Sequence, residues 1–346
     1  MVKDVILTTD LYHQHGDPND HFNLAAMYAL DKMGLINFVG IMCDDDKPLA
    51  GPDGDKYLHF GDPSVQSIAQ MNYITGRSVP VGVGSRRPVK CKQDLEELVK
   101  DNPPIGSVNL LIKALENTKT KVDIHMCGCC RDVLTAAAMR PELFKEKCGG
   151  IFLNAGNYGS NDPIEYNVSL EPYAFSQIFN IPCDIYWSPC FEVLTPYPYL
   201  TSERGTYYEI SHREILPYLS EDMKKYFTYM FEYVMDVNWL SFLRSDVSEE
   251  RIQNWVNERV GKRQMWSTPG FLKSANCSVT TDGEIVPEGH NDAIYGYTPV
   301  EVECTEKGEI SWKDVEKSHI YMFKNIGADI YAKAMSEVIK TLYRVL

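Results

Sequence analysis

Residues 5–33 read VILTTDLYHQHGDPNDHFNLAAMYALDKM and decide the predicted fold. The apolar, β-branched run from Val5 to Thr9 is typical of a buried strand, and it passes into a polar connection at Asp10. The stretch Asp20–Met33 then places its apolar residues at helical spacing, which predicts an amphipathic helix. A strand, a short connection and a helix form one βα unit, which is the repeating element of parallel sheets.

The same alternation continues along the chain. Further strands are predicted at Phe38–Met42, Val79–Val83, Val122–Met126, Gly150–Asn154 and Cys183–Trp187. Helical patterns cover Asp132–Lys147 and Met322–Leu346. Together these elements predict an α/β protein with a mostly parallel, Rossmann-like sheet and helices on both faces.

The pattern changes between about residues 190 and 285. Prolines interrupt the chain after Ser188, and a helix-rich, aromatic block follows from about Arg213 to Val260. Aromatic side chains at helical spacing fill helix interfaces more often than they bind ligands. We interpret this block as an insertion within a single domain that spans residues 1–346.

Composition narrows the classes of partner. A formal net charge of −14 works against nucleic acid and anionic membranes, because both attract basic surfaces. The chain has no apolar run of about 18 residues and no signal-peptide pattern at its N-terminus. Its ten cysteines are scattered without regular spacing, which favours free thiols and a cytoplasmic protein.

The first strand-to-helix connection is rich in carboxylates. It holds Asp10, Asp17 and Asp20 together with Asn19, at the strand end where parallel sheets bind ligands. Asn19 or Asp20 could instead cap the helix, and Asp17 could belong to a turn. A buried carboxylate such as Asp10 needs a cation or a donor. Ca²⁺ or Mg²⁺, with oxygen ligands, would satisfy several of these groups together.

The ordered motifs resemble the inosine-uridine nucleoside hydrolases. Members of that family open with a strand that ends in Asp-x-Asp-x-Gly-x-Asp-Asp, and Asp10 to Asp20 resembles a lengthened version with Asn19 in place of one aspartate. The segments that follow in family order are Thr75–Gly84, Ile124–Leu134, Gly150–Gly156, Pro163–Val168 and Gly289–Ile294. The chain resembles the nucleoside-hydrolase-like branch with a lengthened first metal loop.

The resemblance implies a calcium site and a sugar site. The metal ligands would be Asp10, Asp20, Asp292 and the backbone carbonyl of Cys127. The ribose hydroxyls would meet Glu165 and Asn167, although these residues could also be a surface glutamate and a turn former. The residues Asn19, Asn154 and Asn291 would complete the substrate-binding side chains.

This sequence matches the proton-transfer groups of the family less closely than it matches the metal ligands. An asparagine amide does not accept a proton at neutral pH, so Asn19 cannot be the base and Asp17 is the hypothetical base. The leaving-group acid would be His290, with His13 and His15 as alternatives. Between His290 and Asp292 this chain carries Asn291, which departs from the family's His-Asp-Ala.

Two further clusters of polar residues or cysteines have more than one interpretation. Asp45 or Asp46, after the second strand, could line the pocket or belong to a solvated loop. The sequence Cys127-x-Cys129-Cys130 favours tight turn packing over a zinc site, because no second Cys or His pair completes a tetrahedral set nearby.

The leading hypothesis is a metal-dependent hydrolase of N-glycosidic bonds in ribonucleosides or related glycosyl compounds. One alternative is a protein of the same fold that binds sugar or nucleoside without turnover. Another is a metal-dependent phosphoesterase, which would need a second cation about 3.5–4 Å from the first. The resemblance also implies a homo-oligomer.

Overall fold

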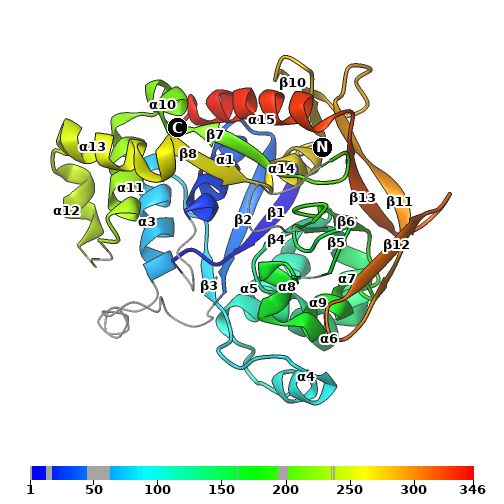
Figure 1. The fold of residues 1–346 in the computed structure, drawn as a ribbon. Coiled ribbons are helices and arrows are strands. Elements are labelled where there is room, and N and C mark those ends of the chain that lie inside the picture. Colours follow the sequence, from blue (N-terminus) through cyan, green and yellow to red (C-terminus); the bar gives the residue numbers. More distant parts are fainter. Residues whose placement is uncertain are drawn as a thin grey trace.

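The computed structural model describes residues 2–12, 18–44, 63–161, 163–193, 202–234, 236 and 238–346. The strands of its central sheet are β1 (Lys3–Thr9), β2 (Ile36–Cys43), β3 (Val81–Val83), β4 (Val122–Cys127), β5 (Cys148–Leu153), β6 (Ile185–Trp187), β11 (Tyr295–Cys304), β12 (Ile310–Asp314) and β13 (Ile320–Asn325). They lie in the order β12-β11-β13-β6-β5-β4-β1-β2-β3 (Figure 1).

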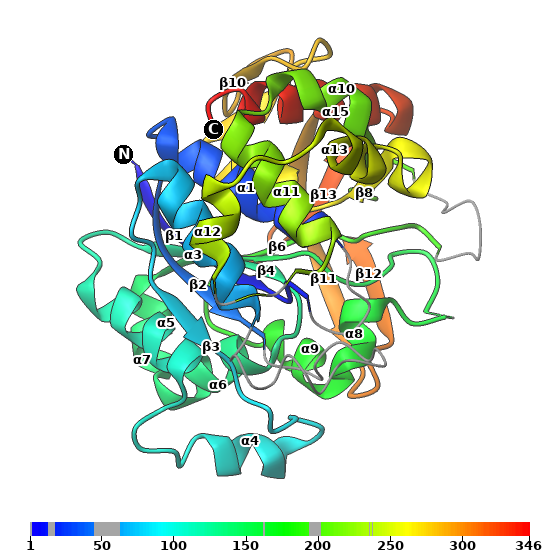
Figure 2. The ribbon, with the colours of Figure 1, turned by 90° about the vertical axis from the view of Figure 1, so that its left-hand side faces the viewer.

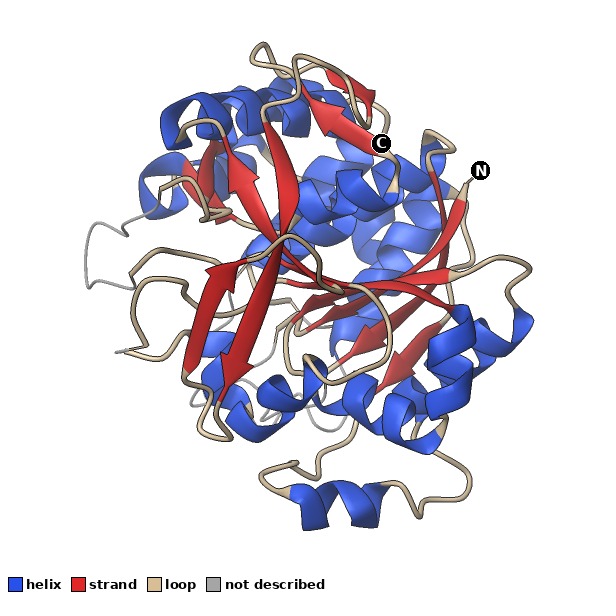
Figure 3. Cartoon of the chain, turned by 90° about the vertical axis from the view of Figure 1, so that its right-hand side faces the viewer, coloured by secondary structure: helices blue, strands red, loops and turns tan. Residues whose placement is uncertain are grey.

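The sheet is parallel from β3 to β13 and antiparallel at one edge. β13 pairs in parallel with β6, and β11 pairs antiparallel with β13 and with β12. This edge lies on the right of Figure 1, the side that faces the viewer in Figure 3. The expected α/β class with a mostly parallel sheet is therefore confirmed. Each of the six predicted strands overlaps an observed strand.

Helices cover both faces of this sheet. They are α1 (Asn19–Lys32), α3 (Pro63–Thr75), α4 (Lys92–Leu98), α5 (Gly106–Asn117), α6 (Arg131–Met139), α7 (Pro141–Lys147), α8 (Tyr166–Leu170), α9 (Pro172–Ile178), α10 (His212–Ile215), α11 (Glu221–Phe231), α12 (Trp239–Arg244), α13 (Glu249–Val256), α14 (Thr268–Ser274) and α15 (Ala328–Tyr343), with 3₁₀ helices η2 (Leu216–Tyr218) and η3 (Glu258–Gly261). Two small sheets pair β7 (Tyr208–Ser211) with β8 (Lys262–Met265) and β9 (Cys277–Val279) with β10 (Ile285–Pro287).

Two buried apolar clusters lie in these layers. One joins α1, α11, α14 and α15, and the other joins α5, α6, α7 and α9 (Figures 1 and 2). β1 lies between them, so Val5, Ile6 and Leu7 are all fully buried, as a strand covered on both faces requires. The end of α15 reaches α1, where the Tyr343 hydroxyl donates to the Phe22 carbonyl at 2.8 Å.

Two predicted helices differ from the observed ones. The predicted helix Asp132–Lys147 divides into α6 and α7 at Arg140, because Pro141 has no N–H to continue the ladder and instead starts the next helix. The prediction of one helix over Met322–Leu346 was wrong at its start. Met322 pairs with Trp187 in the sheet, and the helix begins only after Gly327.

The aromatic block between β7 and β8 contributes to the core. Tyr226, Phe227 and Tyr229 of α11 are fully buried, in agreement with the expectation that most of its aromatics fill helix interfaces. All ten cysteines are free thiols. Within the described part of the chain, every helix is too short or too polar to cross a membrane.

Two buried histidines join neighbouring elements, His21 between α1 and α11 and His125 between β4 and α14. His21 Nδ1 lies 2.9 Å from the Tyr226 hydroxyl, and His125 stacks on Phe152 with its Nε2 2.8 Å from Ser274 Oγ. Burial lowers the pKa of both rings to about 3, because the imidazolium form loses its hydration. Both side chains therefore stay neutral in the folded protein.

We expect stability to fall as the solution becomes acidic. The folded pKa of these histidines lies below the unfolded value of about 6.5, so below that pH only the unfolded chain takes up their protons. Stability is complete above about pH 6.5 and falls toward pH 3 by up to about 1.4 kcal/mol per pH unit for each histidine. Urea unfolding at several pH values checks this. His125→Phe should show a shallower slope, and an unchanged slope would contradict the assignment.

Candidate functional site

A cavity of about 290 Å³ lies at the carboxyl ends of β1, β4 and β5. Its lining comprises Asp10, Asn19, Asp20, Cys127, Asn154, Glu165, Tyr166, Asn167, Cys190, Phe191, Arg259, Gln264, Trp266 and Ser267. This edge of a parallel sheet is where such folds bind ligands. The volume lies near the lower end of the range of about 300–1,000 Å³ that holds small molecules.

Seven of the residues singled out in the sequence meet on this lining. They are Asp10, Asn19, Asp20, Cys127, Asn154, Glu165 and Asn167. They come from the ends of three strands and from the N-terminal ends of α1 and α8, so the fold gathers segments that are far apart in the sequence. Asp17, His13, His15, Asp45 and Asp46 lie outside the described residues.

The segment His290-Asn291-Asp292 is not brought to this lining. All three residues are exposed, and the Asp292 amide donates locally to His290 Nδ1 at 3.2 Å. The segment leads into β11, which lies beyond β6 and β13 in the sheet and so away from β1, β4 and β5. Contrary to the expectation that they join Asp10 and Asp20, these three residues lie on the exposed surface and are not part of the described cavity lining.

Trp266 and Ser267 also line the pocket, although both lie in the predicted insertion at about residues 190–285. Ser267 Oγ donates to Asn154 Oδ1 at 2.8 Å and accepts from Cys127 Sγ at 3.3 Å. The residue stands at the N-cap position of α14 without a side-chain capping hydrogen bond, and Pro269 lies in the first turn of that helix. A serine followed two residues later by a proline is a helix-start signal, and it could have indicated this junction from the sequence.

Glu165 and Asn154 form a fixed polar wall. Glu165 caps α8 and accepts from the amides of Gly156 at 2.8 Å and Asn167 at 3.0 Å. Burial raises the pKa of Glu165, and the nearby charge of Asp10 adds to the effect. Asn154 Nδ2 donates to the Ser188 carbonyl at 2.8 Å, which directs its Oδ1 toward Ser267.

An aromatic group forms another part of the lining. Phe191 and Trp266 meet edge to face with ring centroids 5.7 Å apart, and both lie 5.7 Å from Tyr207. Such groups provide flat apolar surface for a planar ligand.

Comparison with known proteins gives matches only among solved structures. No family model matches the sequence, and no curated protein is found as a relative. The inosine-uridine preferring nucleoside hydrolase from Bacillus anthracis aligns over 100% of both chains with a TM-score of 0.53 and 11% identity. A plant nucleoside hydrolase aligns over 98% of this chain and 99% of its own, with a TM-score of 0.53 and 14% identity.

The chain has the nucleoside hydrolase fold. The type III effector protein XopQ, solved in complex with adenosine diphosphate ribose, also shares this fold, with a TM-score of 0.55 and 12% identity over 99% of this chain and 94% of its own. Enzymes and effectors thus occur on the nucleoside hydrolase fold, and function has to be argued from the pocket itself.

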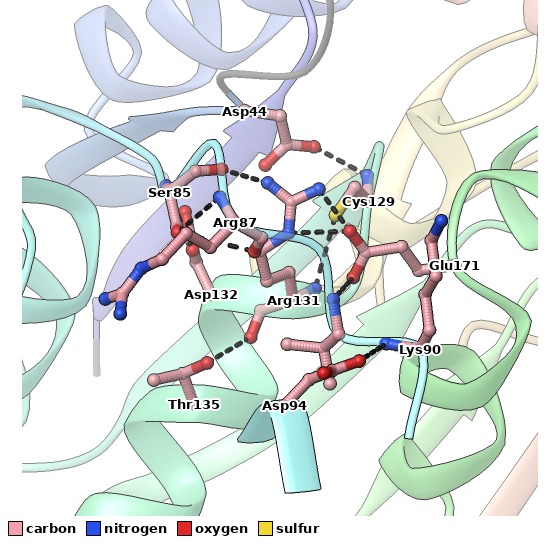
Figure 4. A network of polar contacts seen from close by, with 11 residues as sticks. Asp44, Ser85, Arg87, Lys90, Asp94, Cys129, Arg131, Asp132, Thr135 and Glu171 are labelled. Carbon is pink, nitrogen blue, oxygen red and sulfur yellow. Dashed lines mark hydrogen bonds and ion pairs between the residues drawn. The ribbon is translucent and has the colours of Figure 1, made fainter. Parts of the chain in front are cut away.

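Residues that follow β2 and β4 of this nucleoside hydrolase fold form a buried polar network (Figure 4). Arg131 Nε donates to Glu171 Oε1 at 2.7 Å, and the same guanidinium donates to the Ser85 carbonyl. Asp44, at the end of β2, accepts from the Cys129 amide at 2.6 Å. The network joins the ends of β2 and β4 to the start of α9, so it fixes the loops that follow these strands, and Cys127 of the lining is the last residue of β4.

Gly128 lies between two of the buried carboxylates. A Cβ atom at this position would come within 2.3 Å of Asp44 Oδ2 and 3.5 Å of the Asp10 Cβ. An added methyl group therefore pushes Asp44 away from the Cys129 amide. Glycine lets the β4–α6 turn approach both aspartates.

We expect Gly128→Ala to destabilise the protein by about 1–3 kcal/mol, the cost of leaving a buried hydrogen-bonding group unsatisfied. Urea unfolding measures the loss. The matched control is Gly296→Ala, because a Cβ at Gly296 meets no atom within 4 Å. Equal stability of the two variants would show that Asp44 does not constrain this turn.

The pocket carries oxygen donors of the kind that a hard cation requires. Burial raises the pKa of the Cys127 thiol, and the charges of Asp20, Asp10 and Asp44 raise it further, so these carboxylates gather around the end of β4. Among the described residues, however, no group of three or more His, Cys, Asp or Glu side chains is arranged to hold a metal ion. The pocket offers Asp10 and Asp20 with neutral amide and hydroxyl oxygens. This set matches a hard cation in donor type and holds one carboxylate fewer than predicted.

Proposed function

We propose that the pocket binds a ribonucleoside or a related ribosyl compound and hydrolyses its N-glycosidic bond. The observation that carries this proposal is the placement of Asp10 and Asp20. Both are 95% buried, and both line one cavity with amide, hydroxyl and aromatic groups. Nucleoside hydrolases from several sources share the fold, which supports the same class of ligand.

The reaction places clear demands on such a pocket. Cleavage of an N-glycosidic bond passes through a sugar with oxocarbenium character, and a water molecule must lose a proton. The negative charges of Asp10 and Asp20 favour the developing cationic sugar. The amides of Asn154 and Asn167 provide hydrogen bonds that orient the sugar hydroxyls.

We further propose Ca²⁺ as the cofactor. Asp10, Asp20 and the Cys127 carbonyl would hold it, and the bound ion would supply a Lewis acid for the water and the sugar diol. Asp17 remains the proposed base, since Asn19 cannot accept the proton. His290 is not proposed again as the acid, because it is exposed and does not line the cavity.

A second function is favoured by one specific observation. The described part of the lining contains no histidine, and Ser267 lies between Asn154 and Cys127, where it adds no charge. A pocket without a leaving-group acid can bind a ribosyl ligand without cleaving it. XopQ, which shares the fold, was solved with adenosine diphosphate ribose, a ribosyl compound.

One experiment separates the two functions. A panel of ribonucleosides is mixed with protein in Ca²⁺ or in chelator, and both ligand binding by calorimetry and release of free ribose are measured. Ribose release that requires Ca²⁺ supports the hydrolase. Binding without release supports the second function, and the absence of both binding and release overturns the two together.

A further inference from the structure

Arg259 is a basic residue on a cavity lining whose other charged residues are acidic. It is the only arginine or lysine among the described residues that line the cavity. The same lining carries the acidic residues Asp10, Asp20 and Glu165, in a chain whose net charge is −14. A guanidinium at this position creates a local preference for an anion that the rest of the pocket opposes.

The ion pair between Arg259 and Glu258 can be replaced by a pair between Arg259 and a ligand at little cost. Its Nε lies 3.3 Å from Glu258 Oε1, while the other oxygen of Glu258 accepts from Arg263 at 2.6 Å. Arg263 is 99% buried, whereas the Arg259 side chain is 53% exposed. Losing a partner is costly for a buried charge and costs an exposed one about 1 kcal/mol or less. Arg259 is therefore the partner that can turn toward a ligand while Glu258 stays with Arg263.

The backbone that presents Arg259 is strained. Arg259 has φ 46° and ψ 50°, and Val260 has φ 57° and ψ 24°, so two consecutive non-glycine residues are left-handed. Each costs roughly 1–2 kcal/mol relative to right-handed backbone. The side chain of Val260 is 95% exposed and recovers none of this cost through burial. Strain of this kind persists where the surrounding structure imposes it, and it clusters at ligand-binding sites.

The lining carries charges of both signs. The carboxylates of Asp10 and Asp20 attract a cation, whereas Arg259 is the basic side chain of the described lining that can pair with an anionic group of a ligand. The planar guanidinium matches the oxygens of a phosphate with two parallel hydrogen bonds. We therefore expect a phosphorylated ribosyl compound to place its phosphate at Arg259 and its sugar at the aspartates.

We propose that Arg259 makes the pocket selective for phosphorylated ribosyl compounds, such as ribonucleoside 5′-monophosphates, over the uncharged ribonucleosides. This inference rests on the proposed function, because it concerns the same pocket. It adds a specificity-determining residue and an anionic substrate class.

The test compares the common ribonucleosides with their 5′-monophosphates by calorimetry in Ca²⁺ buffer. Wild type should bind the monophosphate at least about tenfold more tightly than its nucleoside, since a hydrogen bond to a charged group contributes about 1.5–3 kcal/mol. In Arg259→Gln the ratio should fall to about one. Arg259→Lys should retain part of the preference, because it keeps the charge and loses the paired donors.

The control is Arg140→Gln, at an exposed arginine that does not line the cavity, and it should keep the wild-type ratio. The inference is overturned if wild type shows no preference for the monophosphates, or if the preference survives in Arg259→Gln. Failure of every nucleoside and every monophosphate to bind would overturn the proposed function as well, so the two failures are distinguishable.

Discussion

Replacing Arg131 with methionine should lower the free energy of unfolding by about 3–5 kcal/mol, the cost of leaving a buried charge without its partner. Arg131 is 3% exposed and Glu171 is 2% exposed. The Arg131 guanidinium pairs with Glu171 and also donates to the Ser85 carbonyl. The methionine keeps much of the side-chain volume and removes the positive charge, so the Glu171 carboxylate stays buried beside an apolar group.

Urea unfolding measures this loss, and two variants locate its cause. Adding Glu171→Leu to Arg131→Met should restore much of the stability, because a buried ion pair can be replaced by packed apolar residues. The matched control is Arg140→Met, which removes the exposed pair of Arg140 with Glu116 and should cost at most about 1 kcal/mol. If Arg131→Met is no less stable than Arg140→Met, the buried pair does not hold these loops.

Asp10→Asn should reduce ribose release by more than about 100-fold. If the protein binds its ligand without hydrolysing it, the affinity for that ligand should fall by the same factor. Changes to residues that merely support a metal ligand lower affinity or activity by about 10–100-fold, and Asp10 is proposed as a ligand itself. The substitution keeps the shape of the side chain and removes its charge. Calorimetry with Ca²⁺ alone should show a parallel loss of metal affinity.

Asp292→Asn is the matched control for Asp10→Asn. Asp292 was predicted from sequence as a ligand of the same metal, but its side chain is 76% exposed and lies off the pocket lining. We expect the Asp292→Asn variant to behave as wild type. A large loss in this variant together with normal behaviour of Asp10→Asn would reject the proposed site.

The repeated βα pattern was predictable because parallel strands are buried on both faces. That burial leaves continuous apolar runs, such as Val5–Thr9, which a sequence displays directly. The polar residues that follow those runs were predictable for the same reason, since all carboxyl ends of parallel strands meet at one edge. Asp10, Asn154 and Cys127 reach the cavity in this way.

The residues that the sequence could not place are those whose position depends on pairing between distant segments. The His290-Asn291-Asp292 motif matches locally, but its loop is positioned by the pairing of β11 with β13. Trp266 lines the pocket because β8 pairs with β7, and neither short strand has a distinctive apolar pattern. The roles of Asp17 and Ca²⁺ remain predictions.

The pairing of β6 with β13 also affects how the chain folds during its translation. Ile185 lies beside Ile320, so one edge of β6 has no sheet partner on the nascent chain until β13 has left the ribosome. The cover of α1 by α15 is delayed in the same way. During translation, an open strand edge and an uncovered apolar face therefore coexist, and such surfaces promote aggregation. Chaperone demand should accordingly be greatest in the last part of synthesis.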